Sequence, residues 1–469
     1  MSKYIVWFRQ DLRLDDNPAL YYAAKKGQVI PVFIYDDINT QSHTMGQASQ
    51  YWLKNLLKHF QKACLDRLRI FHGDPIEILP KLVHSHQVEG LFWNRCYEPW
   101  RIHRDRHLKS ILKCEVQSFN GSLLWEPWQI LKSDGTPYRV FTPFYRKGCL
   151  VSEHQPREPL ASVDPDIFMP IQADESHPPV EIIPEKKWGE TLLSHWNTTQ
   201  NGPQSRLKQF IQSGLCGYKK ERDFPSHGHT SQLSVDLHWG TLSPNQVRQS
   251  VMAHPVENPK DLDHFLSELG WREFSYYLLY HFPFLPKDNL QKKFDHFPWI
   301  DDKKVLKSWQ FGQTGYPIVD AGMRQMYATG YMHNRLRMIV GSFLVKNLLQ
   351  HWHHGQAWFW ECLVDADLAS NSASWQWIAG SGADAAPYFR IFNPITQGEK
   401  FDPLGEYTKK WVPELQSLPS QYLFKPWEAP HDVLQKANII LGQDYPKPIV
   451  DVRASRERAL AAFQSLKEA

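Results

Sequence analysis

The chain has 469 residues, 42% hydrophobic and 22% charged, so it can bury a large core, and its length suggests roughly two to three domains. No stretch approaches the about 20 apolar residues that span a bilayer, and MSKYIVWFRQ lacks the parts of a signal peptide. Six scattered cysteines without a C-x-x-C pair argue against a disulfide framework or a zinc site. We therefore expect a cytoplasmic protein without a membrane span. Because the net charge is only +3, any nucleic-acid contact would depend on a local cluster of cations.

The first 120 residues alternate between short apolar runs and helical patterns. The apolar runs have the length of buried parallel strands and fall at residues 4–8, 29–35, 68–71, 91–93 and 116–119. Helical patterns lie between them, one over residues 47–65 and another after Asp74, an N-cap candidate before Pro75. This order predicts an α/β domain with a Rossmann-like, doubly wound parallel sheet that binds ligands near the carboxyl ends of its strands. No G-x-G-x-x-G follows the first run, so the usual dinucleotide fingerprint is missing there.

The composition of the chain changes twice after the predicted sheet. Residues 126–200 are rich in proline and polar side chains, which is typical of a long connector that wraps the surface. Beyond them the helical periods become long and alternating β-branched runs become rare. We therefore predict an α/β domain over residues 1–125, a connector over 126–200 and an all-helical domain over 201–469.

A first predicted helix, SELGWREFSYYLLYH, carries polar side chains on one face. Glu268, Trp271 and Arg272 are spaced i, i+3 and i+4, so they share that face. A carboxylate and a guanidinium would be costly to bury there without partners, so taken alone this face favours a solvated stripe in which Glu268 and Arg272 form an ion pair. The alternative is a binding site.

A second predicted helix, GYMHNRLRMIVGSFLVK, repeats this spacing. Asn334, Arg337 and Met338 share a face, whereas Arg335 points elsewhere and could meet a phosphate. The alternative is a partly exposed amphipathic helix without a ligand.

A third segment, LVDADLASNSASWQWIAGSGADAAPYFRIFNP, contains two aspartates two positions apart. Asp365 and Asp367 are followed by Asn371, Trp375 and Trp377. Paired aspartates can bind a metal, but the D-x-[DN]-x-[DN]-G pattern is absent and the preceding helix offers a cationic partner. We therefore expect no metal.

Several long motifs in this order resemble the photolyase/cryptochrome family, and within it the microbial photolyases of cyclobutane pyrimidine dimers. The runs are TGYPIVDAGMRQMYATGYMHNRLRM, DADLASNSASWQW and DAAPYFRIFNPITQGEKFD, and the N-terminal VWFRQDLRLDDNPAL resembles the opening of the family's α/β domain. The strings EPWRIHRDRHL and GSGADAAP are similar to the bacterial branch closest to plant cryptochromes. The resemblance spans nearly the whole chain and is weakest in the connector and near the C-terminus.

The resemblance implies that the helical domain holds a U-shaped FAD. Asn371 matches the residue that faces flavin N5, where an amide can hydrogen-bond a reduced flavin. Hydroxyls and backbone N–H groups in the HTSQLS run suit the pyrophosphate. The residues at the family's other cofactor positions are Tyr218, Thr230, Ser231, Leu233, Ser234, Arg272, Asn334, Arg337, Asp365 and Asp367.

The resemblance also implies a site for a flipped-out lesion. Trp271 and Trp377 match two aromatic walls that replace lost base stacking, and Met338 lies beneath the lesion. Glu268 matches the residue that hydrogen-bonds the thymine edge. Asn334 stands where the (6-4) photolyases resemble His, which favours a cyclobutane lesion because Asn cannot transfer a proton. The residues that match contacts to the DNA backbone are Arg222, Arg335 and Arg390.

Two further sets of residues match the family's accessory positions. Trp375, Trp352 and Trp309 match a tryptophan relay that reduces the flavin from the surface, although each could be ordinary core packing. His43 and Lys287 match residues near a second, antenna chromophore. The usual Asn-Glu pair of that site is replaced by Trp100 and Arg101, and Trp100 could stack on a pterin. We therefore expect methenyltetrahydrofolate in preference to 8-hydroxy-deazaflavin.

The function implied is light-driven DNA repair by a carbon–carbon lyase, in which an electron from excited reduced FAD splits the dimer. The expected partner is UV-damaged DNA, single- or double-stranded and of any sequence, bound by a monomer. A first alternative is a cryptochrome-type photoreceptor with the same fold and FAD but no repair. A second is an ordinary flavin oxidoreductase, which would require a nicotinamide site; the missing fingerprint and the three matched arginines argue against it.

Overall fold

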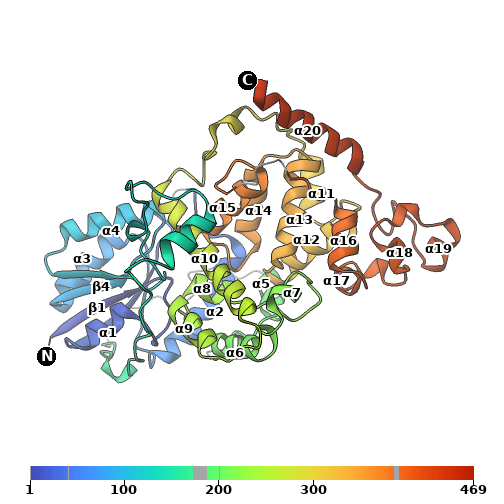
Figure 1. The fold of residues 1–469 in the computed structure, drawn as a ribbon. Helices are drawn as coiled ribbons and strands as arrows, with labels where there is room; N and C mark the ends of the chain where they lie inside the picture. The colour runs from blue at the N-terminus through green and yellow to red at the C-terminus, as the bar shows by residue number, and fades with distance from the viewer. Residues whose placement is uncertain (1, 41, 173–186, 200, 385–389, 469) are drawn as a thin grey trace. The chain divides into compact units, whose positions relative to one another are not determined.

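The computed structural model describes residues 2–40, 42–172, 187–199, 201–384 and 390–468. The strands in these ranges form one parallel sheet of order β3-β2-β1-β4-β5 (Figure 1). Each expected strand is confirmed to within a residue or so of its predicted ends, because a short apolar run leaves little freedom in where a buried strand begins. The strands are β1 (Lys3–Phe8), β2 (Gln28–Tyr35), β3 (Arg69–His72), β4 (Gly90–Asn94) and β5 (Glu115–Phe119).

Contacts divide the chain into two compact units. Unit 1 comprises Met1–Cys216 and Ser231–Pro283, and unit 2 comprises Gly217–Thr230 and Phe284–Ala469. The helices of unit 1 are α1 (Pro18–Ala24), α2 (Gln47–Ala63), α3 (Pro75–His86), α4 (Pro99–Ile111), α5 (Lys187–Leu193), α6 (Gly202–Gln209), α8 (Ser234–Trp239), α9 (Pro244–Met252) and α10 (Pro259–His281). The helices of unit 2 are α7 (Tyr218–Glu221), α11 (Lys303–Gln310), α12 (Pro317–Thr329), α13 (Asn334–Ser342), α14 (Trp352–Cys362), α15 (Leu368–Ala379), α16 (Pro394–Phe401), α17 (Glu406–Trp411), α18 (Ser420–Leu423), α19 (His431–Lys436) and α20 (Val452–Glu468).

Helices cover both faces of the sheet in unit 1 (Figure 1). Alternate side chains of a strand point to opposite faces. Trp7 and Trp93 meet edge to face at 5.8 Å and share one core with Leu79 of α3. On the other face, Phe8 packs against Phe60 of α2 at 4.9 Å. This two-sided burial explains why the strands read as continuous apolar runs instead of alternating ones.

Two helices show how local sequence sets their ends. At the start of α3 the Asp74 carboxylate accepts a hydrogen bond from the backbone N–H of Ile76 at 2.9 Å, and Pro75 is the first helical residue, as expected. Helix α2 begins at Gln47 as predicted and ends at Ala63, before the predicted residue 65. Leu65 adopts a left-handed backbone with a φ of 54°, which stops the helix.

The described part of the predicted connector runs along unit 1. Met169 donates a backbone hydrogen bond to the carbonyl of Val29 in β2 at 2.8 Å. The guanidinium of Arg69 in β3 donates to the carbonyl of Pro170 at 3.0 Å. Residues 173–186 and 200 of the connector lie outside the described residues. The domain limits at 125 and 200 stay predictions.

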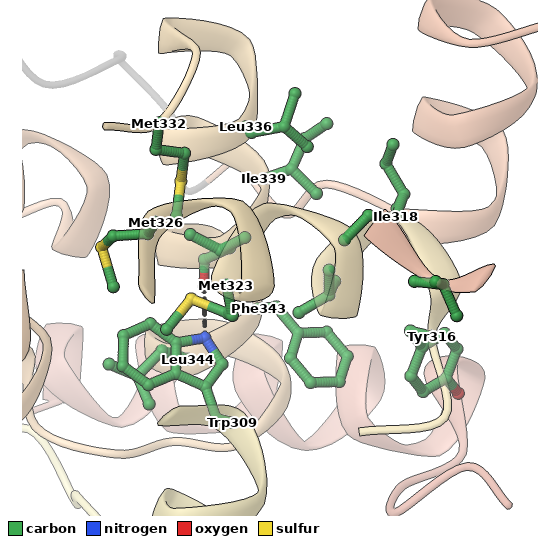
Figure 2. Close-up of a cluster of buried hydrophobic side chains, with 14 of the residues drawn as sticks. Trp309, Tyr316, Ile318, Met323, Met326, Met332, Leu336, Ile339, Phe343 and Leu344 are labelled. Carbon is green, nitrogen blue, oxygen red and sulfur yellow. Dashed lines mark hydrogen bonds between the residues drawn. The ribbon is translucent and has the colours of Figure 1, made fainter. Parts of the chain in front are cut away.

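Unit 2 has a large hydrophobic core, part of which is shown in Figure 2. Trp309 of α11 is fully buried, and its indole N–H donates to the carbonyl of Val340 at 3.0 Å. Tyr316, Met323 and Phe343 from the following segments surround the same core. This core fixes α13 against α11 and α12, and α13 carries several of the expected site residues. None of the described helices is both long and apolar enough to cross a membrane.

Candidate functional site

Four expected site residues lie in the first turns of α13 in unit 2: Asn334, Arg335, Arg337 and Met338. The helix begins here because His333 caps it, with Nδ1 accepting the backbone N–H of Arg335 at 3.1 Å. Burial lowers the pKa of His333 to about 4, so the ring stays neutral and Nδ1 remains an acceptor at neutral pH. Sequence reasoning missed His333, although its place directly before the helix was the available signal.

Arg337 and Asp365 form the best-defined pair of the site. Arg337 Nη2 lies 2.7 Å from Asp365 Oδ2, and its Nε donates to the carbonyl of Met332 at 2.8 Å. The Asp365 side chain is only 2% exposed. Among the described residues, its second oxygen, Oδ1, is buried and has no hydrogen-bond partner. A buried carboxylate oxygen without a partner is costly, so Asp365 Oδ1 marks a position where a ligand donor would be favourable.

The start of α15 positions two further expected residues. Asp367 is the N-cap of this helix and accepts the backbone N–H of Ser370 at 2.6 Å. One turn into the helix, Asn371 donates from Nδ2 to the carbonyl of Gln356 in α14 at 3.0 Å. That bond holds the amide in one orientation and leaves its oxygen available as an acceptor. Further along, Trp377 donates from its indole to the carbonyl of Asp384 at 3.1 Å.

In unit 1, α10 carries Glu268, Trp271 and Arg272, all of them half-buried. The ring of Trp271 stacks on Phe141, with centroids 3.8 Å apart and planes 12° apart, so one indole face is already covered. The Arg272 guanidinium donates to the carbonyls of Ser122 at 2.8 Å and Leu237 at 3.3 Å. One face of the Trp271 indole is thus covered, and Arg272 is held in place by the backbone.

Glu273, beside Arg272 in α10, is a buried acid that sequence reasoning missed. Its carboxylate accepts the backbone N–H groups of Leu124 at 2.9 Å and Trp125 at 3.3 Å, and it lies 3.2 Å from Arg272 Nη1. Burial raises the pKa of Glu273 to about 7, against the opposing effect of Arg272. No motif marked this residue, because its role depends on backbone groups that are distant in the sequence.

The expected phosphate-binding residues run from Tyr218 to Ser234 and divide between the units. Tyr218 and Thr230 belong to unit 2, and Ser231, Leu233 and Ser234 to unit 1. Ser231 Oγ accepts the backbone N–H of Leu233 at 3.3 Å, just before α8 begins at Ser234.

Two of the three arginines expected at DNA, Arg222 and Arg335, lie near each other in unit 2 although they are far apart in the sequence. The Arg222 guanidinium lies over the Tyr218 ring at 5.3 Å. Arg335 pairs with Asp223 at 2.5 Å and lies over the Phe401 ring at 4.3 Å. These contacts fix both guanidinium groups. The third arginine, Arg390, is exposed, and its neighbours at 385–389, in the DAAPYF motif, lie outside the described residues.

The three tryptophans expected to form a relay are all buried in unit 2: Trp375 at 3%, Trp352 at 0% and Trp309 at 0% exposed. Trp309 meets Trp375 edge to face at 6.2 Å. Full burial means that Trp309 does not provide the surface end that the expectation required, which corrects that part of its assigned role.

Trp299, which sequence reasoning missed, is only partly buried. Its ring lies 5.1 Å from the His351 ring, and His351 lies 5.6 Å from Trp352. No motif marked this residue, because a lone tryptophan in HFPWI is typical of core packing. Trp352, His351 and Trp299 therefore form a continuous series of rings from the buried core toward solvent.

The expected antenna residues divide between the units. In unit 1, Trp100 is half-buried, with the guanidinium groups of Arg101 at 4.9 Å and Arg104 at 5.1 Å from its ring. His43 lies in unit 1 as well, whereas Lys287 is an exposed residue of unit 2. Arg104 is itself held by Asp36 at 2.8 Å. These contacts lie just beyond the carboxyl ends of β2 and β4, where parallel sheets bind ligands.

Within the described ranges, no group of three or more His, Cys, Asp or Glu side chains is arranged to hold a metal ion.

Comparison with known proteins identifies both halves of the chain. Residues 4–163 match the family described as DNA photolyase, and residues 265–465 match the FAD binding domain of DNA photolyase. The deoxyribodipyrimidine photo-lyase of Agrobacterium fabrum is 45% identical, with 99% of this chain and 98% of that protein aligned. The Escherichia coli protein of the same name is 37% identical over the full length of both. Cryptochrome-1 of Arabidopsis thaliana is 36% identical over 98% of this chain and 70% of its own length.

The structural comparison agrees. A bacterial class III photolyase from Agrobacterium tumefaciens has a TM-score of 0.94 and 43% identity, covering 100% of this chain and 98% of its own. The FAD expected in the helical part is supported by the matched FAD-binding family and by the buried, unpartnered oxygen of Asp365. Similar relatives along its whole length establish that the chain belongs to the photolyase/cryptochrome family.

Proposed function

We propose that this protein is a light-driven deoxyribodipyrimidine photo-lyase that splits cyclobutane pyrimidine dimers in DNA. The observation that carries the proposal is full-length similarity, at 45% and 37% identity, to two bacterial proteins of that name. We assign the lesion and flavin contacts to Glu268, Trp271, Met338 and Asn371, which match family positions.

FAD is the cofactor of this proposal. Bound in its fully reduced form and excited by light, FAD would supply the electron that opens the dimer. The Arg337–Asp365 pair would hold the flavin, because Asp365 Oδ1 is buried and can accept a donor from it. Asn371 is fixed by Gln356 and would present its amide oxygen to a flavin N–H. The hydroxyls of Thr230, Ser231 and Ser234 and the ring of Tyr218 would contact the phosphates.

The lesion would be bound by stacking and by a single acid. Trp271 has one face covered by Phe141, and its other face can stack on an extrahelical base. Trp377, held through its indole N–H, would supply the second wall. Glu268 would hydrogen-bond the thymine edge. The Asn334 amide is neither an acid nor a base at neutral pH. The site therefore suits a cyclobutane dimer, whose opening requires electron transfer and no proton transfer at that position.

DNA would be held through its backbone without base readout. Arg222, Arg335 and Arg390 would contact phosphates, and such contacts make binding weaken as salt rises. Arg335 is already paired with Asp223, so phosphate would compete with that carboxylate.

The relay that reduces the flavin would begin at Trp375 and pass through Trp352. In place of Trp309, the exit we propose is Trp299, which approaches Trp352 through the His351 ring. At the start of the relay, Gly355 leaves room for the Trp375 ring, since a Cβ on Gly355 would lie 2.1 Å from that ring.

A second chromophore would bind near Trp100 in unit 1, and we favour methenyltetrahydrofolate over 8-hydroxy-deazaflavin. A pterin would stack on the exposed part of the Trp100 indole. Acid extraction of the purified protein followed by chromatography and absorption spectroscopy identifies the chromophore. A deazaflavin, or a second flavin as in the Sulfolobus tokodaii photolyase with two FAD molecules, would overturn this assignment.

The test of repair uses UV-irradiated oligothymidine, blue light and chemically reduced protein. We expect absorbance at the thymine band to recover in the light and not in the dark. Glu268→Ala should slow the recovery sharply, whereas Glu257→Ala, at an exposed position before α10, should not. A protein with reducible FAD that binds the lesion and never repairs it would instead belong with the photoreceptors of the family.

A further inference from the structure

The indole N–H of Trp352 is held by a polar chain that leads out of the core. Trp352 is 0% exposed, and its Nε1 donates to Oδ1 of Asn289 at 3.0 Å. Asn289 is also buried, and its Nδ2 donates to Oδ1 of Asp295 at 2.8 Å. The Asp295 side chain is 44% exposed. A buried indole is thus linked through one amide to a carboxylate in contact with solvent.

The amide orientation follows from these two bonds. An Asn side chain has one acceptor and one donor group, and each is used once here. Because Nδ2 is needed by Asp295, the amide cannot turn over without losing both bonds, so the oxygen stays toward Trp352. The partner of the indole N–H is therefore an amide oxygen, which accepts a hydrogen bond but is too weak a base to take the proton.

The other polar rings around Trp352 do not compete for that hydrogen. His353 lies 3.9 Å from the Trp352 ring and His351 lies 5.6 Å from it. His351 caps α14, with Nδ1 accepting the backbone N–H of His353 at 3.2 Å, so that nitrogen carries no proton. Burial lowers the pKa of both histidines, to about 4 for His351. Both rings are neutral at neutral pH, and neither places a positive charge against the indole.

We propose that Asn289 is a positioning residue of the electron relay, which keeps oxidised Trp352 in its protonated, positively charged form. This inference rests on the relay proposed above. One electron would leave Trp352 to fill oxidised Trp375, after Trp375 had passed its own electron to the bound flavin under light. The amide oxygen stabilises the positive charge and takes no proton, so no bond to hydrogen breaks. An electron from Trp299, restored in turn by an external thiol, then returns Trp352 to its starting state.

The amide is suited to this role where a carboxylate or an alkyl group is not. A carboxylate at position 289 would accept the indole proton and leave a neutral radical, which no longer passes its charge on by electron transfer alone. An alkyl group would leave the buried N–H without a partner, which disfavours the charged form most. A carboxylate would therefore change the protonation state of the Trp352 radical, whereas an alkyl group would lower its yield, although both would slow the relay.

The experiment compares Asn289→Asp and Asn289→Leu with the parent by transient absorption after a light pulse, all in the full-length, FAD-loaded protein carrying Trp299→Phe, so that the radical stays on Trp352. We expect the protonated tryptophan radical in the parent and the deprotonated radical in Asn289→Asp. In Asn289→Leu we expect the protonated radical at a yield lower by about tenfold, the effect of one lost hydrogen bond to a charged group. Asn393→Asp, at the N-cap of α16 where Asp caps equally well, is the matched control and should behave as the parent.

A second readout needs no flavin. In the flavin-free protein labelled with 15N-tryptophan, the resonance of one indole N–H should move in both Asn289 variants and stay unchanged in Asn393→Asp. A protonated radical at parental yield in both Asn289 variants would overturn the inference. Photoreduction that survives Trp352→Phe would overturn it together with the relay. Dimer repair by chemically reduced Asn289→Asp should equal that of the parent, so a failure of the repair proposal would be seen separately.

Discussion

The substitution Gly355→Ala tests how closely the Trp375 ring packs against α14. A Cβ on Gly355 would lie 2.1, 2.4 and 2.5 Å from three atoms of the Trp375 six-membered ring, where ordinary contact begins at 3.4 Å. The ring would therefore have to withdraw by about 1 Å or more, in a core whose density leaves little room. Such overpacking costs about 1–3 kcal/mol, against about 0.5–1 kcal/mol gained when Ala replaces Gly within a helix.

Gly341→Ala is a matched control, because it adds a methyl group toward the same ring from α13. There the new Cβ would lie 3.4 Å from Ile378 and 3.7 Å from Trp375, which is ordinary contact. We expect Gly341→Ala to be neutral or stabilising by up to about 1 kcal/mol. Thermal unfolding of the flavin-free proteins and the rate of FAD photoreduction with a thiol measure the two effects. If Gly355→Ala matched Gly341→Ala in both, the placement of Trp375 against α14 would be wrong.

Three further predictions concern other parts of the site. Arg337→Leu should weaken FAD binding and lower the free energy of unfolding by about 3 kcal/mol, because it leaves the buried Asp365 carboxylate unpaired. Adding Asp365→Asn should recover part of that stability when unfolding is measured without flavin, and no recovery would argue against the pair. Burial raises the pKa of Glu273 to about 7, from 4.5 in the unfolded chain. The stability that protonated Glu273 contributes is therefore full below pH 4.5 and is lost as pH rises through about 7. Glu273→Gln should remove that fall from a plot of melting temperature against pH, and parallel plots for the two proteins would refute the prediction. Trp299→Phe should slow photoreduction strongly whereas Trp309→Phe should mainly lower stability, and the reverse order would restore Trp309 as the exit.

The sheet could be predicted from the sequence because each strand is a short apolar run with two buried faces. The same is true of the cap at Asp74, where the side chain and the following proline act within one turn. Asp367 shows the limit of motif matching. It was expected only as a cofactor residue, and its hydrogen bond to the backbone of Ser370 also makes it the cap that starts α15.

The relay shows what sequence could not supply. Trp309 and Trp299 both lie in the segments before α12, and only their burial separates them: one is enclosed in the core of Figure 2, and the other is partly exposed beside His351. Burial of this kind depends on which helices pack over a residue and leaves no local pattern. Asn289 and Glu273 were missed for a related reason, since each acts on a group far away in the chain.

The most direct test of the central claim is repair of a defined thymine dimer in a short oligonucleotide by the reduced protein, followed by chromatography of the products. We predict that blue light converts the cyclobutane dimer to two thymines, that the dark sample stays unchanged, and that a (6-4) lesion in the same sequence is not repaired, because Asn334 cannot transfer a proton. A protein that holds reducible FAD, binds the dimer and leaves it intact in the light would contradict the account and indicate a photoreceptor.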